Sequence, residues 1–163
     1  MDWTRAIEIN RAALTRIVNE LFAMLGIVSG ITLGRMLRPA ESALRRLIVI
    51  AAHGLLARPI VSRPMPIGLV IKSKGLRRNT TNTGANLSRR LTTLKHALET
   101  IPQQAIRLVR WQVKRAKLSN PKFTTPLRPG RPPGYRAKPE MEIDYILKEC
   151  HALAWDSAYR NSS

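Results

Sequence analysis

The sequence has 163 residues, of which 44% are hydrophobic and only 5% aromatic, and it carries 28 Lys and Arg against 10 Asp and Glu. This length suits one domain with a modest core, and the net charge of +18 favours a polyanionic partner: nucleic acid, an anionic membrane surface or an acidic protein. The single cysteine, Cys150, excludes an internal disulfide framework and a multi-cysteine zinc site, and a reducing, cytoplasmic setting is expected.

The positive charge is concentrated in the middle of the chain. Residues 58–138 hold nineteen basic residues against Glu99 alone, whereas residues 1–57 hold seven basic and four acidic residues, and residues 139–163 hold two basic and five acidic residues. A general bias towards Arg and Lys would not leave both ends nearly neutral. We therefore expect the middle of the chain to bind the partner, with plain solvated surface charge as the alternative.

Residues 1–57 are predicted to form an apolar helical hairpin. Hydrophobic residues recur at helical spacing from Trp3 to Val28, which indicates a long first helix. Pro39 and Glu41 suit the first turn of a second helix, because a proline there forfeits no hydrogen bond and an acid complements the helix dipole.

Three glycines follow one another at intervals of four: Gly26, Gly30 and Gly34. On one helix face they would allow a second helix to approach closely. The surrounding uncharged runs, 21–34 and 47–57, are shorter than the 20 or so apolar residues that cross a bilayer. A hairpin packed in a soluble domain is favoured, and a hairpin lying in the membrane interface is the alternative.

Residues 58–86 change character and are predicted to be a basic linker. Prolines and glycines punctuate the first part, and a polar run from Asn79 to Asn86 ends it. The stretch from Ile67 to Ile71 suits one short strand, but no clear partner strand follows.

Residues 87–118 are predicted to form a pair of basic helices. Leu87, Leu91, Leu94 and Leu98 form the apolar stripe of the first helix. Thr100 suits the N-cap of the second helix, and Pro102 suits its first turn. The apolar face of this second helix is predicted to comprise Ile101, Ala105, Ile106, Leu108, Val109, Val113 and Ala116.

The opposite face of the second helix carries a stripe of Arg107, Arg110, Lys114 and Lys117. In a helix-turn-helix arrangement, Gln103, Gln104 and Arg107 would be the residues that enter the major groove. No glycine marks the turn between the helices, so contacts to phosphates are favoured over the recognition of bases.

Residues 119–138 are predicted to be a proline-rich basic arm, because the run from Pro126 to Arg136 cannot be absorbed by a helix or a central strand. The run Gly130-Arg131-Pro132 resembles the AT-hook, a short motif that binds the minor groove. Arg128 and Arg136 would be the flanking cations. The sequence departs from the motif at Pro129, where a basic residue normally stands, and a stiff connector is the favoured alternative.

Residues 139–163 are predicted to form an acidic C-terminal helix, with an apolar stripe from Ile143 to Ala158. Its early carboxylates complement the helix dipole and are expected to face the basic segment. Trp155 and Tyr159 are expected to close the core.

The sequence contains no pattern of a catalytic or cofactor site. Cys150 and His151 are adjacent, but successive residues of a helix point about 100° apart and cannot form a nucleophile–base pair. The three histidines lack the spacing of metal ligands, and no phosphate-binding glycine loop is present. We therefore expect no enzyme activity, no cofactor and no metal.

Four stretches together look like a group of small basic bacterial proteins without assigned function. These stretches are Met1-Asp2-Trp3, residues 37–41, residues 126–136 and residues 143–155. The resemblance implies no activity, cofactor or site.

The sequence thus predicts an all-α protein: an N-terminal helical hairpin, a basic helix pair and an acidic C-terminal helix, joined by basic linkers rich in proline and glycine. Its predicted function is to bind nucleic acid through phosphates, with little sequence specificity. The alternatives are a membrane-surface protein anchored by the apolar helices of residues 17–57 and an adaptor for an acidic protein. The predicted nucleic-acid contacts are Arg89, Arg90, Arg107, Arg110, Lys114, Lys117, Arg128, Arg131 and Arg136.

Overall fold

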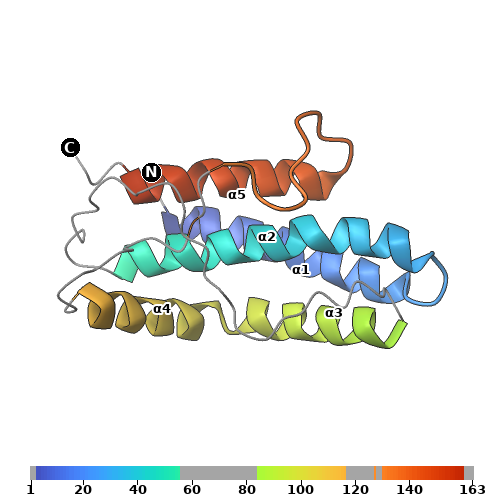
Figure 1. Ribbon diagram of the computed structural model, residues 1–163, viewed down its shortest axis with the longest axis horizontal. Helices are drawn as coiled ribbons and strands as arrows, with labels where there is room; N and C mark the ends of the chain where they lie inside the picture. Colours follow the sequence, from blue (N-terminus) through green and yellow to red (C-terminus); the bar gives the residue numbers. More distant parts are fainter. Residues whose placement is uncertain (1–2, 56–83, 117–126, 128–129, 160–163) are drawn as a thin grey trace.

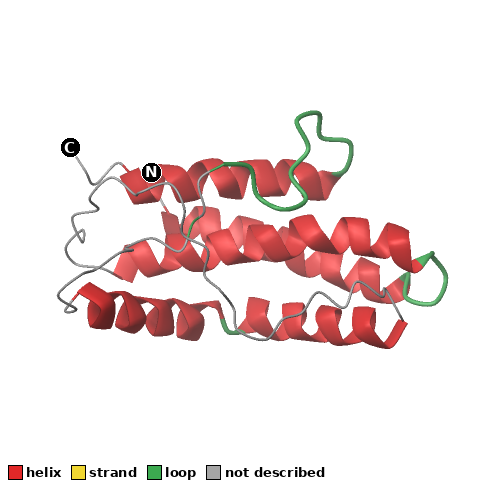
Figure 2. Cartoon of the chain, viewed as in Figure 1, coloured by secondary structure: helices red, strands yellow, loops and turns green. Residues whose placement is uncertain are grey.

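The computed structural model describes residues 3–55, 84–116, 127 and 130–159, and all its regular structure is helical (Figure 2). The helices are α1 (Trp3–Ala23), α2 (Gly30–Leu55), α3 (Gly84–Glu99), α4 (Ile101–Ala116) and α5 (Glu142–Tyr159). The all-α prediction is confirmed. Most of the predicted basic linker, the stretch from Ile67 to Ile71 and the first part of the proline-rich arm lie outside the described residues.

Helix α2 is the centre of the bundle and packs against each of the other four helices. Helix α1 runs antiparallel beside it, as the predicted hairpin requires. Figure 1 shows α5 on one side of this pair and α3 with α4 on the other side. Within the described residues, α4 packs against α2 and touches only the end of α3, so it is the least enclosed helix.

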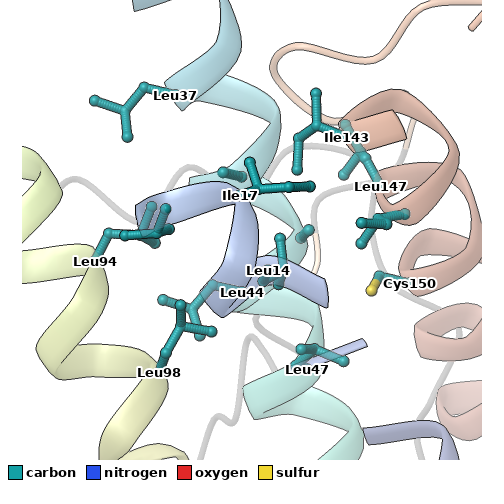
Figure 3. Packing of buried hydrophobic residues seen from close by; sticks show 14 of the residues in the cluster. Leu14, Ile17, Leu37, Leu44, Leu47, Leu94, Leu98, Ile143, Leu147 and Cys150 are labelled. Carbon is teal, nitrogen blue, oxygen red and sulfur yellow. The ribbon is translucent and has the colours of Figure 1, made fainter. Parts of the chain in front are cut away.

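The core is made of aliphatic side chains from all five helices, to which α4 contributes Ile101 and Ala105. In α1, Leu14, Val18 and Leu21 fall on one face because they are three or four residues apart, and each is at most 1% exposed. Figure 3 shows Leu14 and Ile17 of α1 among leucines of α2 and α3, with Ile143 and Leu147 of α5 on the other side. The leucine stripe predicted for α3 is wholly buried.

The turn between α1 and α2 breaks the glycine repeat. Gly26 has φ +88°, a conformation that L-residues with a Cβ rarely adopt, and it lies in the turn. Ser29 caps α2, since its Oγ accepts a hydrogen bond from the backbone N–H of Thr32 at 3.3 Å. Gly30 is the first residue of α2, and Gly34 is buried inside it. The prediction of three glycines on one helix face is therefore wrong.

Pro39 lies inside α2, nine residues after its start, and not in a first turn as predicted. A proline here removes one backbone donor from the helix. Pro39 is buried, and the backbone of Gly134 lies close to it. Local sequence patterns predict that a proline lies in the first turn of a helix. They do not take into account a contact with a residue 95 positions away, such as Gly134.

The segment that covers Pro39 is a tight turn from Pro132 to Tyr135. The backbone N–H of Tyr135 donates to the carbonyl of Pro132 at 3.0 Å, and Gly134 has φ +84°. Pro-Gly at the two central positions, with a positive φ at glycine, is the pattern of a type II turn. The hydroxyl of Ser42 in α2 then donates to the carbonyl of Pro133 at 2.7 Å. The last part of the arm is thus docked on α2 (Figure 1).

Helices α3 and α4 lie in line, end to end, along one side of the bundle (Figure 1). The backbone hydrogen bonds continue through their junction: Thr100 N–H donates to His96 C=O at 3.1 Å, and Gln104 N–H donates to Thr100 C=O at 3.0 Å. Thr100 holds the predicted N-cap position directly before α4, but its hydroxyl donates back to His96 C=O at 2.8 Å and does not cap a backbone N–H of α4. The predicted place of Pro102 in the first turn of α4 is confirmed.

Helix α5 begins with a buried carboxylate. The Oδ2 of Asp144 accepts hydrogen bonds from the backbone N–H groups of Glu140 and Met141, at 3.1 Å each. A third-position acid that reaches back to the cap residue is one half of a capping box. Trp155 is half-buried, and the side chain of Tyr159 lies outside the described residues.

Candidate functional site

The exposed basic residues of α3 and α4 follow one another along these two in-line helices, and we call this set the basic row. Its members are Arg89, Lys95, Arg107, Arg110 and Lys114. None of them takes part in an ion pair within the described ranges, and Glu99 is the only acid on the two helices. The row therefore presents unneutralised positive charge to solvent.

Two of the predicted contact residues are used inside the protein instead. Arg90 makes a bidentate ion pair with Glu41 of α2, with its Nε and Nη2 donating at 3.0 and 3.1 Å. Arg136 donates to Asp144 at 3.2 Å and to Glu140 at 3.3 Å. Planar guanidinium groups suit such paired contacts, which fix α3 to α2 and the arm to α5.

The remaining predicted residues belong to the arm and to the end of α4. Lys117 and Arg128 lie outside the described residues. Arg131 is exposed, and its guanidinium lies 5.7 Å from the centre of the Tyr135 ring. Pro132 is buried against the bundle, so the segment that resembles an AT-hook is folded back at its third residue. We do not include this segment in the basic row.

Lys95 belongs to the row although it is not among the predicted contacts, and the apolar face of α4 is narrower than predicted. Ile106 is 42% exposed and Val113 is 41% exposed, although both were predicted on the packed face. Since α4 packs mainly on α2, only a narrow side that holds Ile101, Ala105 and Gln112 is buried. Ile106 and Val113 lie one turn from Arg110, so the row has an aliphatic border.

The acidic residues of α5 lie on the far side of α2 from the basic row. Glu142 pairs with Arg16 of α1, and the Oε1 of Glu149 accepts a hydrogen bond from Asn10 of α1 at 3.2 Å. No contact between α5 and either α3 or α4 occurs in the described part of the chain. Of the basic segment, only Arg136 is seen to pair with these carboxylates. The carboxylates of α5 therefore do not neutralise the cations of α3 and α4.

A second polar cluster joins α2 to α5. Arg46 is only 6% exposed, and no carboxylate within the described residues pairs with it. Its Nε donates to Nδ1 of His151 at 3.1 Å, and its Nη1 donates to the carbonyl of Ser42 at 2.9 Å. Burial lowers the pKa of Arg46 to about 10, so it stays charged at neutral pH. His53 contacts Ser157 of α5 at 3.0 Å.

This cluster predicts that stability falls in mild acid. Burial lowers the pKa of His53 and of His151 below the ordinary 6.5, with the Arg46 charge adding to the effect at His151. Both histidines are therefore neutral in the folded protein when the unfolded chain begins to bind protons. The stabilisation is fully present above the unfolded value and is lost as the pH falls through 6.5 towards the folded values.

Urea unfolding of the full chain between about pH 8 and pH 5 measures this effect. We expect the midpoint to fall on the acid side, and His151→Gln should make that fall smaller. His96→Gln, on the exposed face of α3, is the control and should leave the profile unchanged. A profile that His151→Gln and His53→Gln both leave unchanged would contradict the assignment.

The thiol of Cys150 is completely buried in the core between the helices (Figure 3). Burial, with Glu149 contributing, raises its pKa to about 12, so the thiol is protonated at neutral pH. Across the described residues, no group of three or more His, Cys, Asp and Glu side chains is placed to hold a metal ion.

Most apolar residues of the 17–57 segment, which the membrane alternative requires, are used in the core. Ile17, Leu37 and Leu47 are examples with at most 4% exposure. No helix in the described ranges combines the length and the apolar character needed to cross a bilayer. Comparisons of the chain with models of protein families, with curated proteins and with solved structures found no match.

Proposed function

We propose that this protein binds nucleic acid through its phosphates, using the basic row of α3 and α4. The observation that carries the proposal is the row itself: five exposed cations on two helices in line, none of them in an ion pair within the described residues. Phosphate contacts of Lys and Arg supply most of the affinity for nucleic acid that does not depend on sequence.

The dimensions of the row suit a duplex. Arg89 and Lys114 are 25 positions apart, which corresponds to about 38 Å at a rise of roughly 1.5 Å per helical residue. Successive base pairs of a duplex are about 3.4 Å apart along its axis, so the row spans about eleven base pairs. The acidic helix α5 lies on the other side of α2, and it would not repel a polyanion docked on the row.

The in-line arrangement of α3 and α4 favours phosphate contacts over base contacts. A helix-turn-helix sets its second helix at roughly 90–120° to the first and inserts the N-terminal residues into the major groove. Here the backbone hydrogen bonds continue past Thr100, and the start of α4 lies against the end of α3. Gln103 and Arg107 therefore lie along the side of the bundle and not at a protruding end.

The experiment is a salt titration of binding to a duplex of about twenty base pairs, a length that covers the row. We expect log affinity to fall linearly with log salt concentration, with a slope of roughly 0.9 for each phosphate contacted. Replacing Arg107, Arg110 and Lys114 together by Ala should reduce that slope by about 2 to 3 and weaken binding at least tenfold. The affinity for A·T-rich and for G·C-rich duplexes should fall by the same factor.

The matched control removes three exposed cations from other helices: Arg11→Ala, Arg45→Ala and Lys148→Ala together. Both triple variants lower the net charge by the same amount. If the row is the contact surface, the control should change the slope far less, because its three cations lie elsewhere. Equal effects of the two triple variants would show a diffuse attraction to the whole molecule and would sink the proposal. A wild-type slope near zero would do the same.

A further inference from the structure

The turn between α1 and α2 presents two aliphatic side chains to solvent. Ile27 is 83% exposed and Ile31 is 69% exposed, the largest values among the exposed large hydrophobic residues of the described chain. This turn, which we call the hairpin tip, comprises residues 24–31. It extends beyond the start of α3 at one end of the long axis of the bundle (Figure 1).

The fold does not need these two side chains. Met24 and Leu25 of the same turn pack against the core, whereas Ile27 and Ile31 are not part of that packing. The turn itself is fixed by other groups, namely the positive φ of Gly26 and the cap at Ser29. Two exposed aliphatic side chains in one turn, neither of them used by the core, are therefore candidates for a contact site.

Cations follow the tip along the outer face of α2. Arg35 and Arg38 are four and seven residues after Ile31, on the same side of the helix, and both are exposed. Neither takes part in an ion pair within the described residues. No acidic residue occurs in the sequence between Glu20 and Glu41.

We propose that the hairpin tip docks on an anionic lipid surface, with Ile27 and Ile31 entering the boundary between headgroups and acyl chains. Arg35 and Arg38 then lie about 6 and 10 Å behind Ile31 along the helix axis. Interfacial segments bury their apolar side about 5–10 Å deep, so the two guanidinium groups reach the level of the lipid phosphates.

The geometry favours lipid over a protein partner. Specific protein interfaces bury about 1,200–2,000 Å² in total and use a broad complementary surface, whereas the tip offers two side chains on a protruding turn. Protruding aliphatic groups with cations behind them match a soft, negatively charged boundary. This contact is peripheral, and it uses a different surface from the basic row, so either proposal can fail without the other.

The experiment places an environment-sensitive fluorophore at Ile27→Cys in the full chain. The native Cys150 is fully buried and will not compete for the label. With vesicles of phosphatidylcholine containing about 30% phosphatidylserine, the emission should shift to the blue, as it does when a probe leaves water. The same label at Lys148→Cys, an exposed position on α5, should not shift.

Co-sedimentation with the same vesicles gives the affinity. The double variant Ile27→Ser with Ile31→Ser should lower the partition coefficient at least about tenfold. Arg35→Ala with Arg38→Ala should lower it by about 25-fold, since each cation near an anionic surface contributes roughly fivefold. Ile106→Ser with Val113→Ser, which removes two exposed aliphatic side chains from α4, is the matched control.

Two results would overturn the proposal. One is that the emission of the label at position 27 does not shift and that the Ile27/Ile31 variant sediments with vesicles like the wild type. Any lipid binding would then come from general electrostatic attraction or from α4. The other is a dimer of the wild type in solution that the Ile27/Ile31 variant abolishes, which would assign the tip to a second copy of the chain. Circular dichroism must show that the variant remains folded, and Ile27→Ala is the fallback if it does not.

Discussion

Replacing Gly134 by Ala is expected to destabilise the protein by about 2–4 kcal/mol. Two costs add at this residue. Its φ of +84° disfavours any side chain, and a Cβ would lie 2.7 Å from the backbone nitrogen of Pro39. That neighbour is backbone in the middle of α2 and cannot move aside easily. Thermal unfolding should show a drop in Tm of roughly 10 °C.

Gly130 provides the control for this prediction. Its φ of +94° is equally unfavourable for a side chain, but an added Cβ would meet nothing within 4 Å. Gly130→Ala should therefore lower the free energy of unfolding only by the cost of a positive φ for a residue with a Cβ, about 1 kcal/mol. Equal losses for the two variants would show that the contact with Pro39 contributes nothing, and that the turn does not need to approach α2 closely.

Replacing Asp144 by Ala is expected to cost about 3 kcal/mol. The carboxylate is buried, and one of its oxygens holds two backbone N–H groups at the start of α5 as well as the guanidinium of Arg136. Its removal leaves those donors and a partly buried cation without an acceptor. The loss should appear as a lower denaturant midpoint in urea unfolding.

Glu140 contacts the same guanidinium but is 76% exposed. Solvent screens an exposed pair, so Glu140→Ala should change the free energy of unfolding by less than about 0.5 kcal/mol. Similar losses for Asp144→Ala and Glu140→Ala would contradict the importance of the buried cap. Arg136→Met reports the contribution of the cation separately, because it keeps most of the side-chain volume.

Hydrophobic periodicity was sufficient to predict that the helices exist. It was insufficient to predict where they begin and end. The predictions for α3, α4 and α5 are confirmed because Leu87, Leu91 and their equivalents repeat at helical spacing. The start of α2 was misplaced by nine residues, since Pro39 lies inside the helix, where it is buried and packed against Gly134. Local rules describe each segment alone, and such a contact between distant segments is invisible to them.

The candidate site was predictable in part for the same reason. Helical angles correctly put Arg107, Arg110 and Lys114 on one exposed side of α4. They could not show that Arg90 and Arg136 are held by carboxylates from other segments, or that Ile106 has no helix to pack against. Charge patterns identify cations, but only the packing of the bundle decides which of them remain unpaired.

The straight course of α3 into α4 has a consequence for the choice among polyanions. The two helices are braced along their inner side by α1 and α2, so the backbone positions that carry the five cations are held in the bundle. Duplex nucleic acid has a persistence length of about 50 nm and is already straight over the span of the row. A single strand must give up conformational entropy to become straight over the same span. For equal numbers of phosphates, the proposed binding should therefore favour a duplex over a single strand.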